Sequence, residues 1–245
     1  MSEVSGIHAV EALLRKAPER VRLLLLQRNR RDARIETLLG LAAEHRVRHE
    51  FAPRQRLDRL GGTAHQGAVA LCHELRLTTE AEFEDQFDGW PSPKLFLVLD
   101  GINDPRNLGA CVRTAAAAGV HAILWPRRRS APLSAAALKA AAGSAEQATL
   151  VEVANLARRL EWLKRLGVWL IGADGTASRP WTAADLTRNV AIVVGSEGQG
   201  LRQLTRKTCD ELAAIPMAGD VGSLNVAVAT GVMLFEAVRQ RTLTG

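Results

Sequence analysis

The chain has 245 residues, of which 47% are hydrophobic and 24% are charged, and this composition excludes a disordered or fibrous protein. Its apolar runs end well short of the roughly 18 residues that a membrane span needs, and its three scattered cysteines offer neither a disulfide framework nor a paired-cysteine metal site. We therefore expect a cytoplasmic, reduced protein with no metal ion and no membrane partner.

The net charge of +6 indicates a polyanionic partner. Most of the basic excess is arginine, whose planar guanidinium binds phosphate through paired hydrogen bonds. Basic residues dominate on both sides of residues 78–90, which hold five acidic residues and no basic one. This distribution favours a nucleic acid over a merely soluble basic surface.

The first part of the chain alternates helical and strand patterns. The spacing of apolar residues predicts helices over 6–16, 32–44 and 54–60, and strands over 21–26, 47–51 and 67–71. Together they predict a small α/β domain over residues 1–76. Its many arginines favour an RNA-backbone surface, although a charged run is usually only a solvated face.

The second part has the pattern of a parallel sheet with crossover helices. Residues 77–93 are acidic, rich in turn residues and without a clear period, and they predict a linker. Residues 94–245 then form the second predicted domain. The expected strands are 95–99, 122–125, 149–153, 168–173, 190–194 and 212–215, and the expected helices are 107–118, 134–142, 156–166 and 225–239.

Polar residues follow several of these strands, where ligands of open α/β sheets bind. The segment 100–114 enters a helix that carries Asn107 and Arg113, which are nearly two helical turns apart and can line one face of a cleft. The alternative makes Asn107 a helix cap and Arg113 a solvated arginine. Cys111 has no evident basic partner and is interpreted as a core residue.

The glycine-rich turn 195–200 occupies the analogous place after the expected strand 190–194. Its glycines lack the dinucleotide-binding spacing and no Lys-Ser/Thr pair follows, so nucleotide phosphate binding is disfavoured. What remains is a sharp turn that presents backbone amides, Ser196 and Glu197 at a cleft. The arginine run 127–129 follows another strand and fits phosphate contact and a solvated surface equally well.

A further glycine-rich loop, with Asp220, Ser223 and Asn225, precedes the last expected helix. The free N–H groups of a helix start can hold a polar or anionic ligand. Ser223 or Asn225 could instead simply cap the helix.

Three segments together resemble the motifs of the SpoU, or TrmH-type, RNA ribose methyltransferases. They are Asn107-Leu-Gly-Ala-Cys-Val-Arg113, Val194-Gly-Ser-Glu-Gly-Gln-Gly200, and Ile215-Pro-Met217 with Ser223-Leu-Asn-Val-Ala-Val-Ala229. Each motif alone is weak, but their order and spacing over 95–245 make the set specific. The opening Gly6-Ile-His-Ala-Val10 and the later Gln66-Gly67-Ala-Val are similar to a subgroup that has an additional amino-terminal RNA-binding domain and methylates a guanosine ribose in 23S ribosomal RNA.

The resemblance implies a parallel-sheet domain whose carboxyl-terminal segment forms a deep trefoil knot. It implies that S-adenosylmethionine is held there by backbone groups and side chains at Gly195, Ser196, Ile215, Met217 and Leu224. A homodimer is also expected, with the site near the subunit interface. The small residues early in the last helix fit a knot, because close backbone crossing leaves little room for side chains.

The resemblance also implies how methyl transfer to a ribose 2′-hydroxyl is divided among residues. It assigns the base role to Arg113 with help from the substrate phosphate; because guanidinium groups stay protonated in proteins, Arg113 could instead position the phosphate and stabilise the alkoxide. Asn107, Glu197, Ser223 and Asn225 orient Arg113, the ribose and the loops.

Three alternatives to ribosomal RNA methylation stay open. The first is a transfer RNA ribose methyltransferase, because such enzymes share all three motifs. The second is a non-catalytic RNA-binding or ribosome-assembly protein on the same scaffold, which the intact set of polar motif residues disfavours. The third is a knotted methyltransferase that acts on a base nitrogen, which the spacing between Asn107 and Arg113 disfavours.

Overall fold

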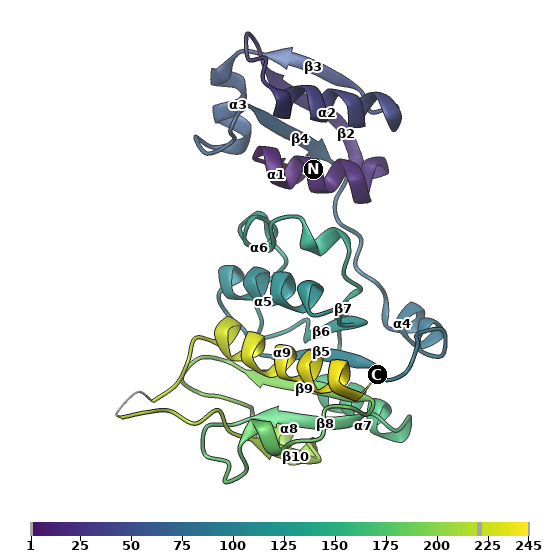
Figure 1. Ribbon diagram of the computed structural model, residues 1–245, viewed down its shortest axis with the longest axis vertical. Coiled ribbons are helices and arrows are strands. Elements are labelled where there is room, and N and C mark those ends of the chain that lie inside the picture. The colour runs from purple at the N-terminus through teal and green to yellow at the C-terminus, as the bar shows by residue number, and fades with distance from the viewer. Residues whose placement is uncertain (1, 220–221, 245) are drawn as a thin grey trace.

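The computed structural model describes residues 2–219 and 222–244. Met1, Asp220, Val221 and Gly245, and with them the loop position predicted for Asp220, lie outside the described residues. The chain forms two lobes, each built on its own sheet, and an extended stretch after residue 72 joins them (Figure 1).

The amino-terminal lobe is a four-stranded mixed sheet with helices packed on it. Its strands are β1 (Ser2–Ser5), β2 (Val21–Gln27), β3 (His49–Ala52) and β4 (Ala68–Cys72), in the order β1-β4-β2-β3. Its helices are α1 (Ile7–Lys16), the short η1 (Pro18–Arg20), α2 (Ala33–Glu44) and α3 (Arg54–Gly61). β2 runs parallel to β3 and antiparallel to β4, and β4 runs antiparallel to β1. The predicted alternation is present, and β1 is an addition to it.

Amphipathic spacing explains why these helices form and where they pack. Val10, Leu13 and Leu14 of α1 are fully buried in one cluster, together with apolar residues of α2 and of the sheet. Asp32 caps α2, because its Oδ1 accepts hydrogen bonds from the backbone N–H groups of Arg34 and Ile35, each at 3.1 Å.

The segment predicted to be an acidic linker without a clear period contains a helix, α4 (Glu80–Phe87), which the sequence did not predict. Thr79 starts the helix in a capping box with Glu82. Phe83 and Phe87, one turn apart, are buried against the ring of Phe96 from the larger sheet. A helix of two turns is too short to show a clear 3.6-residue repeat of apolar residues, and Phe83 and Phe87 stand among acidic residues in the sequence.

The carboxyl-terminal lobe is a six-stranded sheet in which all strands are parallel, as predicted. The strands are β5 (Leu95–Asp100), β6 (Ala122–Pro126), β7 (Leu150–Val153), β8 (Trp169–Ala173), β9 (Val190–Gly195) and β10 (Glu211–Ala213). Their order is β10-β8-β9-β5-β6-β7. The helices are α5 (Pro105–Ala117), α6 (Ala135–Ala141), η2 (Ser144–Glu146), α7 (Leu156–Arg165), η3 (Trp181–Ala183), α8 (Gln203–Thr208) and α9 (Val226–Thr244).

Helices cover both faces of this sheet, which is why its central strands are apolar throughout. Leu97 and Ile192 point to the face covered by α5, α6 and α9, while Phe96 and Val193 point to the face covered by α4 and α7. Figure 1 shows α9 lying across the sheet beside α5. The carboxyl ends of β5, β8 and β9 therefore meet the starts of α5 and α9 at one edge.

Several elements of this lobe differ from the sequence prediction. The last strand is 211–213 rather than 212–215, the polar helix α8 was not predicted, and α9 continues to Thr244 instead of ending at 239. Among the described residues, no helix combines the length and hydropathy that a membrane crossing requires.

Candidate active site

A cleft of about 1000 Å³ opens where β8, β9 and β10 end. Its walls come from residues after β8, from the turn after β9 and from the chain between β10 and α9. All the residues predicted to hold a cofactor line it, namely Gly195, Ser196, Ile215, Met217 and Leu224. Glu197 and Ser223 line it as well.

The turn 195–200 is closed by backbone contacts. The Gly200 N–H donates to the Ser196 carbonyl at 2.9 Å, and the Ser196 N–H donates to the Gly200 carbonyl at 3.1 Å. A Cβ on Gly195 would lie 2.1 Å from the carbonyl carbon and oxygen of Gly200, so only glycine fits there. Gly198 and Gly200 have φ of +79° and +64°, which glycine adopts without strain. The turn thus keeps its backbone close to the cleft.

Glu197 joins the starts of two helices beside this cleft. Its Oε1 accepts hydrogen bonds from Asn107 Nδ2 at 3.0 Å and from Asn225 Nδ2 at 2.6 Å. The backbone N–H of Val226, the first residue of α9, lies 3.4 Å from the same oxygen. Asn225 Nδ2 also donates to Asn107 Oδ1 at 3.0 Å. The structure therefore brings together three of the residues predicted to be catalytic.

This arrangement is favourable electrostatically. The Glu197 carboxylate contacts the side chain of Asn107 in the first turn of α5 and the backbone N–H of Val226 at the start of α9, where the helix dipoles favour negative charge. Asn225 also caps α9, because its Oδ1 accepts a hydrogen bond from the Ala227 N–H at 2.9 Å. The cap of α5 is Asp104, whose Oδ1 accepts from the Arg106 N–H at 2.7 Å. Asn107 is therefore available to bind Glu197.

Two other predicted residues stand apart from this network. Arg113 is exposed on α5 and forms no hydrogen bond or ion pair with any described residue. Ser223 is exposed and lies in the cleft wall without a hydrogen-bond partner among the described residues. The described residues that line the cleft include neither Asn107, Asn225 nor Arg113, so these three lie outside its wall.

Asp174, Thr176 and Arg206 form a part of the cleft wall that the sequence analysis missed. Asp174 accepts hydrogen bonds from Arg206 Nε and from both the N–H and the hydroxyl of Thr176. Although partial burial raises the pKa of the Asp174 carboxyl, its contacts with Thr176 and Arg206 hold it below the usual value. Asp174 directly follows β8, so its place at a strand end was the available signal.

The arginine run 127–129 contributes to the architecture at this edge. Arg127 pairs with Glu152 at 3.2 Å, and the Arg129 carbonyl accepts a hydrogen bond from Arg202 Nη2 at 2.9 Å. The backbone N–H of Arg202 in turn donates to the buried Asp100 at 3.0 Å. Arg128 is exposed and has no such partner among the described residues.

Burial favours the protonated form of all three cysteine thiols. Burial raises the pKa of Cys72 and Cys111 to about 11 and that of Cys209 to about 12. Cys111 lies 3.6 Å from the buried Thr230 hydroxyl of α9, as expected for a core residue. Within the described part of the chain, no group of His, Cys, Asp and Glu side chains could hold a metal ion.

We expect iodoacetamide at pH 8 to leave these cysteines unmodified in the native protein, because alkylation needs the thiolate. The protons would be lost only as the pH approaches about 11. Mass spectrometry before and after adding denaturant measures this, and all three cysteines should react once the chain unfolds. Rapid native labelling of Cys111 would contradict its placement in the core.

Two family models match this chain. Residues 94–235 match the SpoU rRNA Methylase family, and residues 4–78 match the family described as RNA 2'-O ribose methyltransferase substrate binding. Similar curated proteins include the 23S rRNA (guanosine-2'-O-)-methyltransferase RlmB of Pseudomonas syringae pv. tomato, 48% identical over 99% of this chain and 97% of that protein. RlmB of Escherichia coli K12 is 47% identical over 99% of this chain and 100% of that protein.

Solved structures agree with the fold. The SpoU methyltransferase AviRb from Streptomyces viridochromogenes, in complex with the cofactor AdoMet, has a TM-score of 0.79 at 25% identity, covering 98% of this chain and 90% of that one. An AdoMet-bound rRNA methyltransferase from Sinorhizobium meliloti has a TM-score of 0.78 at 25% identity, covering 98% and 87%.

Proposed function

Because the chain belongs to the SpoU rRNA methylase family, we propose that it transfers the methyl group of S-adenosylmethionine to the 2′-hydroxyl of a guanosine in 23S ribosomal RNA. The observation that carries this proposal is the identity of nearly half the residues with RlmB proteins over essentially the whole chain. Two similar structures of transfer RNA enzymes cover 62% and 61% of this chain.

The cleft residues fit the cofactor. S-adenosylmethionine combines an aromatic base, a ribose and an amino acid with a sulfonium methyl group, and it carries no phosphate. The cleft offers apolar side chains at Ile215, Met217 and Leu224 and backbone polar groups in the turn 195–200, without a phosphate-binding pattern. We propose that these groups hold the cofactor, which supplies an electrophilic methyl group.

Arg113 would act on the RNA in this proposal. It is exposed and pairs with no described residue, so it is free to bind the phosphate beside the target ribose and to stabilise the alkoxide as the 2′-hydroxyl loses its proton. Glu197, through Asn107 and Asn225, would fix the starts of α5 and α9 so that the turn and Arg113 keep their relative positions. Ser223, exposed in the cleft wall, would bind the ribose.

We further propose that the segment from β10 to α9 passes through a loop of the same domain, residues 94–245, to form a trefoil knot. The close approach of α9 to α5 supports it. Thr230 of α9 is fully buried beside Cys111 of α5, and a Cβ on Gly231 would be in ordinary van der Waals contact with Thr114 Cγ2 at 3.5 Å. Two small residues, Thr230 and Gly231, therefore lie where α9 packs on α5.

The chain would act as a cytoplasmic homodimer. On α9, Val228 and Phe235 are 52% and 49% exposed although they are apolar, and their seven-residue spacing places them on one helix face. A second copy that covers this face would lie near Arg113, which is exposed on the neighbouring α5. This supports a site close to the subunit interface.

The amino-terminal domain, residues 1–76, would bind the RNA backbone, with residues 77–93 joining it to the catalytic domain. Its exposed arginines without an ion-pair partner among the described residues are Arg28, Arg31, Arg34, Arg46, Arg48 and Arg59. Arg30 is different, because it is half-buried, pairs with Asp32 and donates to the Gln66 carbonyl. Arg30 thus supports the fold of this lobe.

The proposal is tested with purified protein, labelled S-adenosylmethionine, and 23S and transfer RNA transcripts. We expect label in the 23S transcript, at a guanosine whose ribose resists alkaline cleavage, because 2′-O-methylation removes the nucleophile of that cleavage. Label confined to transfer RNA would move the substrate to the alternative. Label on a base, or none on any RNA, would reject ribose methylation.

A further inference from the structure

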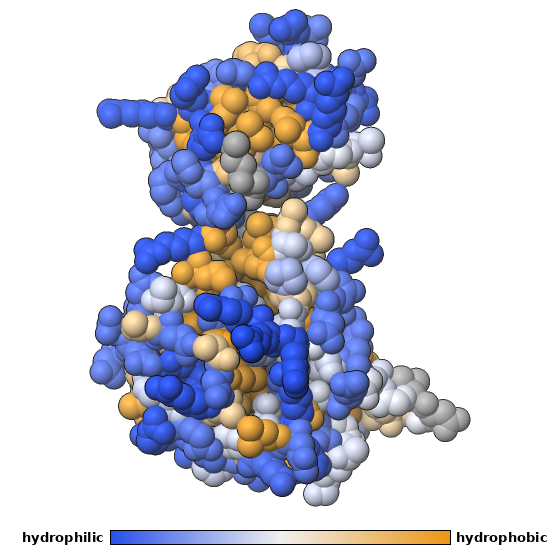
Figure 2. All heavy atoms as spheres, turned by 180° about the vertical axis from the view of Figure 1, so that it is seen from behind, coloured by the Kyte–Doolittle hydropathy of each residue, from blue (hydrophilic) through white to orange (hydrophobic). Residues whose placement is uncertain are grey.

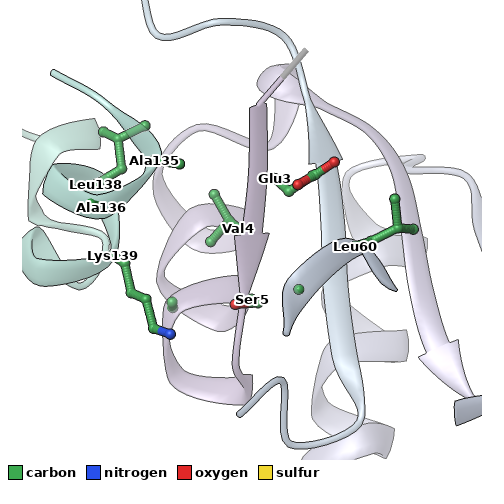
Figure 3. A pocket seen from close by; sticks show the side chains of 10 residues that line it. Glu3, Val4, Ser5, Leu60, Ala135, Ala136, Leu138 and Lys139 are labelled. Carbon is green, nitrogen blue, oxygen red and sulfur yellow. The ribbon is translucent and has the colours of Figure 1, made fainter. Parts of the chain in front are cut away.

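The two lobes touch through a small set of elements. β1 and α1 of the amino-terminal lobe lie against α6 and η2 of the larger lobe. A small cavity of about 230 Å³ opens beside this contact, and Figure 3 shows Val4 of β1 and Lys139 of α6 on opposite sides of it. Figure 2 shows hydrophobic side chains gathered around the narrow waist between the lobes. The junction is therefore small and incompletely filled.

One ion pair crosses this junction. Arg20, at the end of η1, contacts Glu146, at the end of η2, and their side chains are only 11% and 4% exposed. Arg20 Nη2 also donates to the His73 carbonyl at 2.9 Å, where the chain leaves β4. Because both charges are withdrawn from water, loss of either partner would leave the other uncompensated in the junction.

Close packing at two glycines connects the Arg20–Glu146 pair to α5, the helix that carries Asn107 and Arg113. Gly143, which has φ of +84° and precedes η2, approaches α1 so closely that a Cβ would lie 3.0 Å from Ala12 Cβ. On the other side of α6, a Cβ on Gly109 of α5 would lie 2.1 Å from the Ala137 carbonyl oxygen. Displacement of the amino-terminal lobe would thus shift α6, and because α6 packs directly on α5, it would shift α5 as well.

We propose that Arg20 and Glu146 are positioning residues that determine substrate specificity. The pair holds the amino-terminal lobe in one orientation on α6 and η2, so that RNA bound by that lobe presents one ribose, and not its neighbours, to the site on α5. This inference rests on the proposed RNA methylation and adds to it how the target nucleotide is selected. An error of about 1 Å in such alignment can lower a rate about 100-fold.

The test compares the full-length variants Arg20→Glu, Glu146→Arg and the double charge reversal. The matched control is Arg15→Glu, which makes the same charge change on α1, where Arg15 pairs with Glu11 on the exposed side of the same helix. Each protein is assayed for S-adenosylmethionine affinity, RNA affinity, single-turnover transfer to saturating RNA, position of the methylated ribose, and small-angle X-ray scattering.

Each single reversal should lower transfer at the target ribose about 100-fold, shift label to neighbouring nucleotides and change the scattering curve. Cofactor affinity should be unchanged, and the RNA affinity of Arg20→Glu should match that of Arg15→Glu, which makes the same charge change. The double reversal should restore the transfer rate, the methylated position and the scattering curve. If a single reversal fails to fold, Glu146→Gln takes its place. This variant keeps the shape of the side chain and should show the same defects more weakly.

Transfer and position equal to those of Arg15→Glu in the single reversals would overturn the proposal. So would a slow rate with unaltered methylation position and scattering, or a double reversal that restores nothing. If the unchanged protein methylates no RNA, the proposed function fails, while the scattering comparison still reports whether the pair fixes the lobes.

Discussion

Replacement of Arg113 by alanine is expected to lower methyl transfer by about two to four orders of magnitude, the range for a positioned proton-transfer or oxyanion-stabilising group. Folding and cofactor affinity should stay near those of the unchanged protein. The side chain is exposed on α5 and pairs with no described residue, so its loss leaves no buried group unpaired. It also lies outside the wall of the cleft proposed to hold the cofactor. Single-turnover transfer to saturating RNA measures the effect.

Two further variants separate the chemistry of Arg113 from its charge. Arg113→Lys should restore little activity, because a point charge cannot reproduce the planar fork that binds phosphate. Arg165→Ala removes an exposed arginine from α7 on the opposite face of the sheet and should change transfer little. If Arg113→Ala transfers as fast as Arg165→Ala, Arg113 is only a solvated helix residue, and catalysis would depend on Glu197 and Asn225.

Long apolar patterns predicted the fold well, whereas the short elements β1, α4 and α8 escaped prediction. Each central strand of the large sheet is buried on both faces, so its residues form a continuous apolar run such as 190–194. β1 has one apolar residue in four and obtains its stability from pairing with β4. α4 and α8 are less than three turns long, and only tertiary contacts show which of their residues are buried.

The location of the site could be predicted from the sequence, but the hydrogen bonds between its side chains could not. Parallel strands end at one edge, so the turn 195–200 and the segment around Asn107 had to lie near each other. From the sequence, Asn107 could be either the cap of α5 or a site residue. The choice between them depended on whether another residue caps α5. Asp104 does so, which leaves the Asn107 amide to bind Glu197. Such a bond joins residues 90 positions apart, beyond the reach of local patterns.

The second large effect is expected from a substitution in the turn 195–200, which lines the cleft. Gly195→Ala should weaken S-adenosylmethionine binding about 100-fold. Its Cβ would meet the carbonyl carbon and oxygen of Gly200 at 2.1 Å, and backbone atoms cannot rotate away as a flexible side chain can. The turn must open or move, and either change displaces Ser196 and Glu197, which line the cleft. Overpacking costs of about 1–3 kcal/mol are usual in tightly packed sites, and about 1.4 kcal/mol corresponds to tenfold in affinity.

Gly175→Ala is the matched control for this variant. Gly175 also lines the cleft, but a Cβ there would meet no atom within 4 Å, and its φ is not in the left-handed region. Calorimetric titration with S-adenosylmethionine and thermal unfolding should show losses in Gly195→Ala and little change in Gly175→Ala. Equal affinities would show that the turn can shift without altering the cofactor site. The backbone of residues 195–200 would then not be what holds the cofactor, and the apolar residues Ile215, Met217 and Leu224 would have to supply most of the binding.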